Sequence, residues 1–335
     1  MAASNARLNV KLENQTPFAT RILQMERDEG RVQAVLIVKA TFELGSGAAR
    51  AGRWTSATEQ VPIVDDKLDT PFGVFHTDCF TRKEGVDVCV LGTVRPPRAL
   101  REITLRLDVA GYSSTLRVLG DRRWMRVGNE LSASSPLPFA EMPLGYSHAY
   151  GGIAEHDYES ITWPDNPIGR GYYLSADRAQ AQLLPNIEPA MGPLVRHWAD
   201  QPPTAGWAPY PMFWGMRARE GVIPPKNPES GEMASLKPRL NNNAHPSLIV
   251  ADLSPGSVVR IRGMRSEDIV FELPHLSLVA EIKAGRQTTA ELQGQIDGAY
   301  IWTDAGRITL TQRIPFSYVH QKGEVRLARL AERGS

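Results

Sequence analysis

A mainly β fold is predicted by three features of this 335-residue sequence. Several segments alternate apolar and polar residues with a period of two and are rich in β-branched residues, which is typical of strands. No segment shows the periodicity of an amphipathic helix beyond about two turns. Twelve of the 25 prolines fall in residues 185–246, where they interrupt helices and sheet ladders. We therefore predict two sandwich-like or barrel-like β lobes, joined by an irregular region rich in proline and tryptophan that holds a few short helices.

The N-terminal lobe, residues 1–135, is expected to consist of strands. In residues 103–109 the apolar positions alternate with Thr, Arg and Asp, as in an antiparallel strand with one solvated side. Ala110 and Gly111 then make a hairpin to residues 112–119 plausible. The central strands predicted in this lobe are residues 34–44 and 86–94.

The middle region, residues 136–250, is expected to be irregular but ordered. Four of the seven tryptophans lie in or just before its proline-rich part, whereas a disordered linker would be poor in aromatic residues. The C-terminal lobe, residues 251–335, returns to period-two alternation. The strands predicted there are residues 257–263, 268–274, 276–283, 307–313 and 324–330.

Charge and composition argue against several classes of protein. The formal net charge is +1, so no global attraction to nucleic acid or to an anionic membrane is expected. The sequence shows no apolar run of signal-peptide length at its start and none that approaches the roughly 20 residues of a membrane helix. Two cysteines in a chain this long indicate no disulfide scaffold. We predict a cytoplasmic protein and leave its oligomeric state open.

The common catalytic motifs are incomplete in this sequence. A phosphate-binding loop is missing, and the GRGYY segment that begins at Gly169 lacks the third glycine of a dinucleotide fingerprint. The segment GYSHA ends with Ala149 where a nucleophile elbow requires glycine. His148, His156 and Asp157 do not have a recognised metal-ligand spacing. We therefore expect no enzymatic activity, no cofactor and no bound metal.

An alternative keeps enzymatic activity open, because carboxylates that meet in space need not be close in sequence. In this alternative, a carbohydrate- or peptidoglycan-active enzyme would use scattered acids, with the aromatic region as its substrate platform. The acids that could be nominated are Asp65, Asp66, Asp121, Glu141, Glu155 and Asp157.

Two compact segments in the middle of the chain suggest a tightly built backbone feature. They are FAEMPLGYSHAYGG, residues 139–152, and NPIGRGYY, residues 166–173. Their glycines suit a bend or a close approach of two chain segments that side chains would obstruct. In GDRRW, residues 120–124, the acid beside two arginines suits either an ion pair that closes a hairpin or a clamp for an anion on a partner. The residues assigned to this structural motif are Asp121, Arg122, Gly151, Gly152, Asn166, Gly169 and Asn186.

Eight short segments of the sequence resemble, in the same order, a bacterial family of unknown function that is encoded beside type VI secretion genes. These segments are NQTPFAT (14–20), VLIVKATFEL (35–44), QVPI (60–63), HTDCFTRKEGVDVCVLGTVRPP (76–97), VLGDRRW (118–124), PFAEMPLGYSHAYGG (138–152), NPIGRGY (166–172) and LPNIE (184–188). The chain departs from the family towards its C-terminus, where Gln312 stands in place of a tryptophan. Members of this family are thought to be adaptors or chaperones that load toxic effectors onto the secretion spike.

The resemblance implies a cytosolic adaptor whose partners are a type VI effector toxin and the spike or its tip protein. Aromatic residues and arginine dominate binding hot spots, and the middle region supplies them. A structural component of the secretion apparatus is a further alternative. The residues expected to contact the partner are Tyr146, His148, Trp163, Arg170, Tyr172, Trp198, Trp207 and Trp214.

Overall fold

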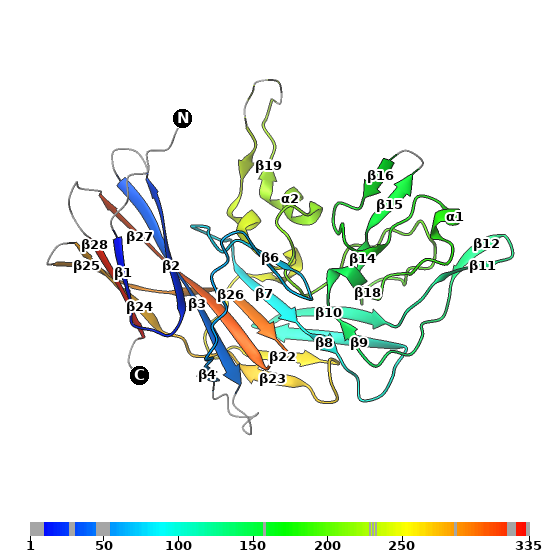
Figure 1. Cartoon of the computed structure of the whole chain (residues 1–335), viewed down its shortest axis with the longest axis horizontal. Coiled ribbons are helices and arrows are strands. Elements are labelled where there is room, and N and C mark those ends of the chain that lie inside the picture. Colours follow the sequence, from blue (N-terminus) through cyan, green and yellow to red (C-terminus); the bar gives the residue numbers. More distant parts are fainter. Residues whose placement is uncertain are drawn as a thin grey trace.

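The computed structural model describes residues 10–26, 31–44, 54–156, 159–227, 229, 231, 233–284, 287–319 and 326–332. The prediction of a mainly β fold is confirmed, because three larger sheets and several two-stranded ones account for most of the regular structure (Figure 1). Within these ranges no sheet closes into a barrel, and the α-helices are the short α1 (Ala176–Ala179) and α2 (Gly215–Gly221). None of the described helices combines the length and the apolar character that a membrane crossing requires.

The largest sheet combines strands from both ends of the chain. Its order is β2 (Ala19–Glu26), β3 (Arg31–Leu44), β27 (Arg307–Val319), β26 (Gln295–Trp302), β7 (Val86–Leu91) and β21 (Ile249–Val250), and β4 (Trp54–Ser56) pairs with β3. Both predicted central strands occupy interior positions, since β3 lies between β2 and β27 and β7 lies between β26 and β21. All six side chains of β7 are buried, as expected for a strand covered on both faces.

The second sheet has five strands and carries the predicted hairpin. Its order is β18 (Ile187–Pro189), β10 (Tyr112–Leu119), β9 (Glu102–Val109), β22 (Val258–Arg262) and β23 (Ile269–Glu272). Ala110 and Gly111 connect β9 to β10 with φ angles of +46° and +82°, the signs that a tight two-residue hairpin turn requires. In β9 the apolar side chains face the core while Thr104 and Arg106 face solvent.

A third sheet pairs the two ends of the described chain. Its order is β1 (Val10–Asn14), β28 (Arg326–Glu332), β24 (Leu278–Ala284) and β25 (Gln287–Gln293), and β1 runs parallel to β28. Strands of residues 1–135 and 251–335 therefore share all three larger sheets, which differs from the two separate lobes expected from the sequence. The period-two pattern indicates which face of a strand is buried, but it does not specify the partner strand.

The middle region consists of short elements that pack over and beside these sheets. Its strands and 3-10 helices are β13 (Met142–Pro143), η2 (Tyr146–His148), β14 (Tyr150–Gly151), β15 (Ile153–His156), β16 (Glu159–Thr162), β17 (Arg170–Gly171), β19 (Val222–Ile223), β20 (Ser235–Leu236), η4 (Pro238–Asn241) and η5 (Pro246–Leu248). The hairpin of β19 and β20 projects from the body of the molecule (Figure 1). The remaining short strands are β5 (Lys67–Asp69), β6 (Val74–His76), β8 (Thr93–Val94), β11 (Trp124–Val127) and β12 (Glu130–Ala133).

Candidate functional site

Residues 145–152 and 166–171 fold into one compact unit, which we call the junction. Its centre is the enclosed side chain of Asn166, whose Nδ2 donates to the carbonyl oxygens of Tyr146 at 2.8 Å and Tyr150 at 3.1 Å. Strands β14 and β17 then pair in parallel, with Gly151 opposite Gly171. One amide side chain thus ties together two carbonyls of an irregular loop, which also accept hydrogen bonds from the Ala149 N–H and from Oγ1 of Thr204, respectively.

The glycines of the junction are needed because the two chain segments touch. Gly151 has a φ angle of +149°, and a Cβ at this position would overlap the carbonyl oxygen of Asn166. A Cβ on Gly169 would lie 2.7 Å from the carbonyl oxygen of Ala149. Substitution at Gly151 would therefore bring both backbone strain and a steric clash.

Asn186 links the junction to the five-stranded sheet. Its Nδ2 donates to the carbonyl oxygen of Leu119 at 3.1 Å and to Oδ1 of Asp121 at 2.9 Å, while its Oδ1 accepts from Nη1 of Arg170 at 3.0 Å. Nδ1 of His148 lies 3.4 Å from the same Oδ1. Burial and the nearby Arg170 guanidinium lower the pKa of His148, so its neutral form is favoured. His148 and Arg170 are thus both engaged within the fold.

Arg122 has a different partner from the one expected in the GDRRW segment. Its side chain is only 3% exposed and pairs with Glu188, and Nη2 also donates to the carbonyl oxygen of Pro185 at 2.9 Å. Asp121 instead accepts a hydrogen bond from Asn186. The predicted ion pair within one hairpin is therefore wrong for these two residues, because Arg122 turns inward to neutralise a buried carboxylate that is distant in sequence. This burial also removes Arg122 from any clamp on a partner.

Two of the aromatic residues expected to bind a partner belong to the core instead. Tyr146 and Trp207 are each 1% exposed. The Tyr146 hydroxyl donates to the carbonyl oxygen of Ala208 at 3.1 Å, and Trp207 Nε1 donates to Oγ of Ser114 at 2.9 Å. Their rings are packed inside the fold and their polar atoms form hydrogen bonds there, so neither side chain presents surface to a partner in this structure.

The other expected aromatic residues are half-buried and pack on one another or on small clusters. Trp163 lies with its ring centroid 5.1 Å from that of Tyr172. Trp214 contacts Tyr146 edge-on at 5.6 Å, and Trp198 packs against the small cluster around Val195. Each of these side chains is partly exposed to solvent, and its buried side packs against neighbours within the fold.

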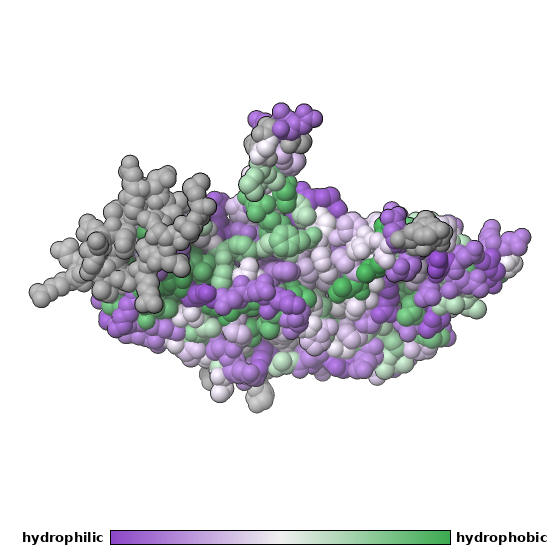
Figure 2. All heavy atoms as spheres, turned by 45° about the horizontal axis from the view of Figure 1, so that its top comes forward, coloured by the Kyte–Doolittle hydropathy of each residue, from purple (hydrophilic) through white to green (hydrophobic). Residues whose placement is uncertain are grey.

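A group of exposed apolar side chains that the sequence reasoning missed lies around the projecting hairpin. We call Phe213, Ile223, Met233 and Leu236 the hairpin patch; Phe213, Met233 and Leu236 are 74%, 88% and 66% exposed. Figure 2 shows hydrophobic residues gathering at the foot of this projection, below a hydrophilic tip. Phe213 lies two residues before the start of helix α2, which lies beside the hairpin in Figure 1. The surrounding segment has no regular periodicity, so only its exposure in three dimensions distinguishes these residues.

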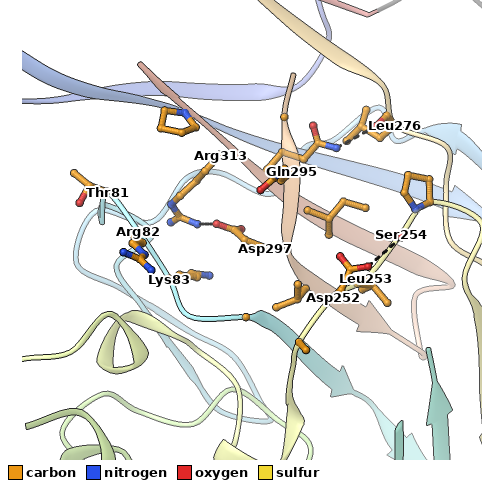
Figure 3. Close-up of a pocket in the computed structure, with 18 residues that line it drawn as sticks. Thr81, Arg82, Lys83, Asp252, Leu253, Ser254, Leu276, Gln295, Asp297 and Arg313 are labelled. Atoms are coloured by element: carbon orange, nitrogen blue, oxygen red, sulfur yellow. Dashed lines mark hydrogen bonds and ion pairs between the residues drawn. The ribbon is translucent and has the colours of Figure 1, made fainter. Parts of the chain in front are cut away.

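A cavity of about 610 Å³ opens beside the start of β26 and the middle of β27, and Figure 3 shows the side chains that line it. Beneath it, Asp297 pairs with Arg313 and accepts a hydrogen bond of 2.5 Å from Oγ1 of Thr311. The pairing of β26 with β27 shifts register between Ile296 and Gly298, which places Asp297 in a β-bulge. Burial opposes ionisation of Asp297, but the Arg313 guanidinium outweighs it and keeps the pKa of this carboxyl below its usual value.

Four further charged side chains are buried beside this pair. We call the resulting group of six the charge layer; it consists of Lys39, Asp78, Lys83, Asp87, Asp297 and Arg313. Nζ of Lys39 lies 2.8 Å from Oδ2 of Asp78, and Nζ of Lys83 lies 2.8 Å from Oδ2 of Asp87. Arg313 extends the layer, since its Nη2 donates to the carbonyl oxygen of Asp78 at 2.6 Å. Three acids thus balance three bases, the condition under which burial of charge is tolerated.

Asp87 holds a loop of the middle region onto the largest sheet. It accepts from the backbone N–H groups of Asn243 at 2.9 Å and Ala244 at 3.1 Å, and from Nδ2 of Asn242 at 3.0 Å. Burial alone would raise the pKa of Asp87, but Lys83 and these hydrogen bonds lower it below its usual value.

The acids nominated for an enzyme have separate partners. Asp65 pairs with Arg21, Glu141 lies 3.7 Å from Arg95, and Glu155 accepts from Ser160. Asp157 lies outside the described residues, as does the side chain of His156. Among the residues that the structure describes, no group of three or more His, Cys, Asp or Glu side chains is arranged to hold a metal ion.

Comparison with known families assigns the chain to one of them. The model of a family described as "Uncharacterized protein conserved in bacteria (DUF2169)" matches residues 29–313, and the chain belongs to this family. The match extends from β3 to β27, so it includes the junction, the charge layer and the projecting hairpin. A search of the curated proteins and a search of the solved structures return no match for the chain.

Proposed function

We propose that the protein is an adaptor or chaperone that binds a type VI secretion effector and assists its loading onto the secretion spike. The resemblance of eight ordered segments to a family encoded beside type VI secretion genes supports this proposal.

The structural observation that carries the proposal is the hairpin patch. Phe213, Met233 and Leu236 each leave about two thirds or more of their side chains in water, at 74%, 88% and 66% exposure. Large exposed apolar side chains on and beside a projecting element are typical of protein-binding surfaces, in which a few well-buried anchors supply most of the binding energy. Projection from the body leaves this surface accessible to a large partner (Figure 2).

The partner-binding surface in this proposal is shifted from the aromatic residues that the sequence suggested. Tyr146 and Trp207 are enclosed, and the Trp163, Tyr172 and Trp214 rings pack mainly within the fold. The hairpin patch takes their place as the apolar anchor.

Co-purification from the bacterial host tests the proposal. The tagged protein would be isolated from cells that express the type VI system, and the co-purifying chains would be identified by mass spectrometry. We expect a toxin encoded nearby, or a spike component, with the wild-type protein. The double substitution Phe213→Ser with Leu236→Ser should lower recovery at least about tenfold, because each buried side chain of this size is worth roughly 1.5 to 3 kcal/mol.

A matched control comes from the hairpin of β11 and β12, where Met125 and Val127 are 56% and 65% exposed. Met125→Ser with Val127→Ser removes a similar apolar area at a distant hairpin and should leave recovery unchanged. Absence of any toxin or spike chain with the wild-type protein would contradict the proposal. Equal loss in both double variants would contradict the role of the hairpin patch.

A further inference from the structure

We infer that the cavity above Asp297 and Arg313 binds an extended peptide segment that carries one acidic and one basic side chain. This inference concerns a different surface from the hairpin patch and stands whether or not the adaptor proposal holds.

The floor of the cavity is rigid and already neutral. Nε of Arg313 donates to the carbonyl oxygen of Phe80 at 3.0 Å, and its other nitrogens bind Asp78 and Asp297. Lys83 is likewise neutralised by Asp87. These groups are held in place before any ligand arrives, so they shape the site without requiring a charge from the ligand.

Two charged side chains on the cavity walls remain without an ionic partner among the described residues. Arg82 is exposed and has no hydrogen bond or ion pair from its guanidinium, although its carbonyl oxygen is held by Nδ2 of Asn241 at 2.7 Å. Asp252, on the other wall, accepts only a hydrogen bond of 3.3 Å from Oγ of Ser254. Figure 3 shows Arg82 and Asp252 on opposite sides of the cavity, with Asp297 between them.

A ligand that complements these walls carries an anion at one end and a cation at the other. The cavity of about 610 Å³ adjoins a second one of about 540 Å³, and the two share Thr81, Arg82 and Pro315 as lining residues. This extended shape exceeds what a free amino acid fills and suits several residues of an extended chain. Pro255 and Pro315 add exposed apolar surface to the walls, whereas Leu253 and Leu276 line the cavity but are almost fully buried.

Selection from a phage-displayed library of random heptapeptides tests this inference on the full-length protein. We expect the wild-type protein to enrich peptides with an acidic and a basic residue within about four positions of each other. Arg82→Glu leaves two acids on the walls, so acidic residues should disappear from the selected peptides while basic ones remain. Asp252→Lys should produce the reverse. Glu59→Lys, at a side chain that is 88% exposed outside both cavities, is the control and should select the same peptides as the wild type.

The best wild-type peptide would then be titrated by fluorescence anisotropy. Arg82→Ala should weaken its binding about twofold to fivefold, the range for one solvent-exposed ion pair. Thermal unfolding of each variant checks the fold, and both substituted side chains are exposed, so unchanged melting is expected. Selected peptides without acidic and basic enrichment, or the same peptides for all variants, would overturn the inference.

Discussion

The junction and the charge layer both bury polar side chains, but they do so over very different distances along the chain. In the junction, Asn166 satisfies carbonyls that lie 16 and 20 residues away. In the charge layer, Arg313 donates to a carbonyl oxygen 235 residues away. The first unit stabilises an irregular loop from within, whereas the second joins the beginning, the middle and the end of the chain. Substitutions in the charge layer should therefore affect the whole fold, and those in the junction should act more locally.

The largest effect is expected for Asp87→Ala. This change leaves the Lys83 ammonium buried without its carboxylate and removes the acceptor for the N–H groups of Asn243 and Ala244. Loss of one partner of a buried ion pair costs about 3 to 5 kcal/mol, which urea denaturation would measure. Asp252→Ala, at an exposed aspartate, is the control and should change the free energy of unfolding by less than about 0.5 kcal/mol. Equal effects of the two substitutions would show that the charge layer does not join the fold together.

Gly151→Ala should have the next largest effect. The new Cβ would overlap the Asn166 carbonyl oxygen at a backbone φ angle of +149°. We expect a loss of about 2 to 3 kcal/mol in the free energy of unfolding. Gly192→Ala is closely matched, because Gly192 has a φ angle of +140° but no atom within 4 Å of the new Cβ. The difference between the two variants isolates the close approach in the junction, and no difference would mean that the junction is loosely packed.

The contrast also explains which features the sequence could predict. The strands β9 and β10 and their turn were recognisable because alternation and turn residues are local signals. The sequence could not predict that β3 pairs with β27 or that Arg122 pairs with Glu188. No local pattern in the sequence identifies a partner so far along the chain. The glycines of the junction were visible as a compact segment, whereas the hairpin patch was missed because exposure depends on how the whole chain folds.

A smaller effect is expected where the junction meets the five-stranded sheet. Asp121→Ala removes the acceptor for one hydrogen bond from Asn186 Nδ2, which keeps its second acceptor at the carbonyl oxygen of Leu119. The free energy of unfolding should fall by about 1 kcal/mol, as measured by urea denaturation. A loss as large as that of Asp87→Ala would contradict the local character assigned to this contact.

The smallest effect is a dependence of stability on pH through His245, which follows the loop held by Asp87. Its Nδ1 accepts from the Ser247 N–H at 3.2 Å, and its Nε2 lies 3.2 Å from the carbonyl oxygen of Thr204, so the neutral ring fits this site. Burial lowers the pKa of His245. The unfolded chain then binds the proton more readily, and the free energy of unfolding should decrease as pH falls from about 7 through the unfolded pKa of about 6.5. His245→Gln should make this decrease shallower between pH 7 and 5, and His148, whose pKa is also lowered, should contribute to the remainder. An unchanged slope would contradict the assignment.

The central claim is that the aromatic residues around the junction stabilise the fold, while the hairpin patch binds the partner. The amount of partner captured per folded molecule tests this claim most directly. Trp163→Ala and Phe213→Ser would be compared after each protein is purified in its folded form. We predict that Trp163→Ala lowers the free energy of unfolding but leaves capture per folded molecule unchanged, whereas Phe213→Ser preserves stability and lowers capture. Full capture by Phe213→Ser together with loss of capture by folded Trp163→Ala would contradict the claim.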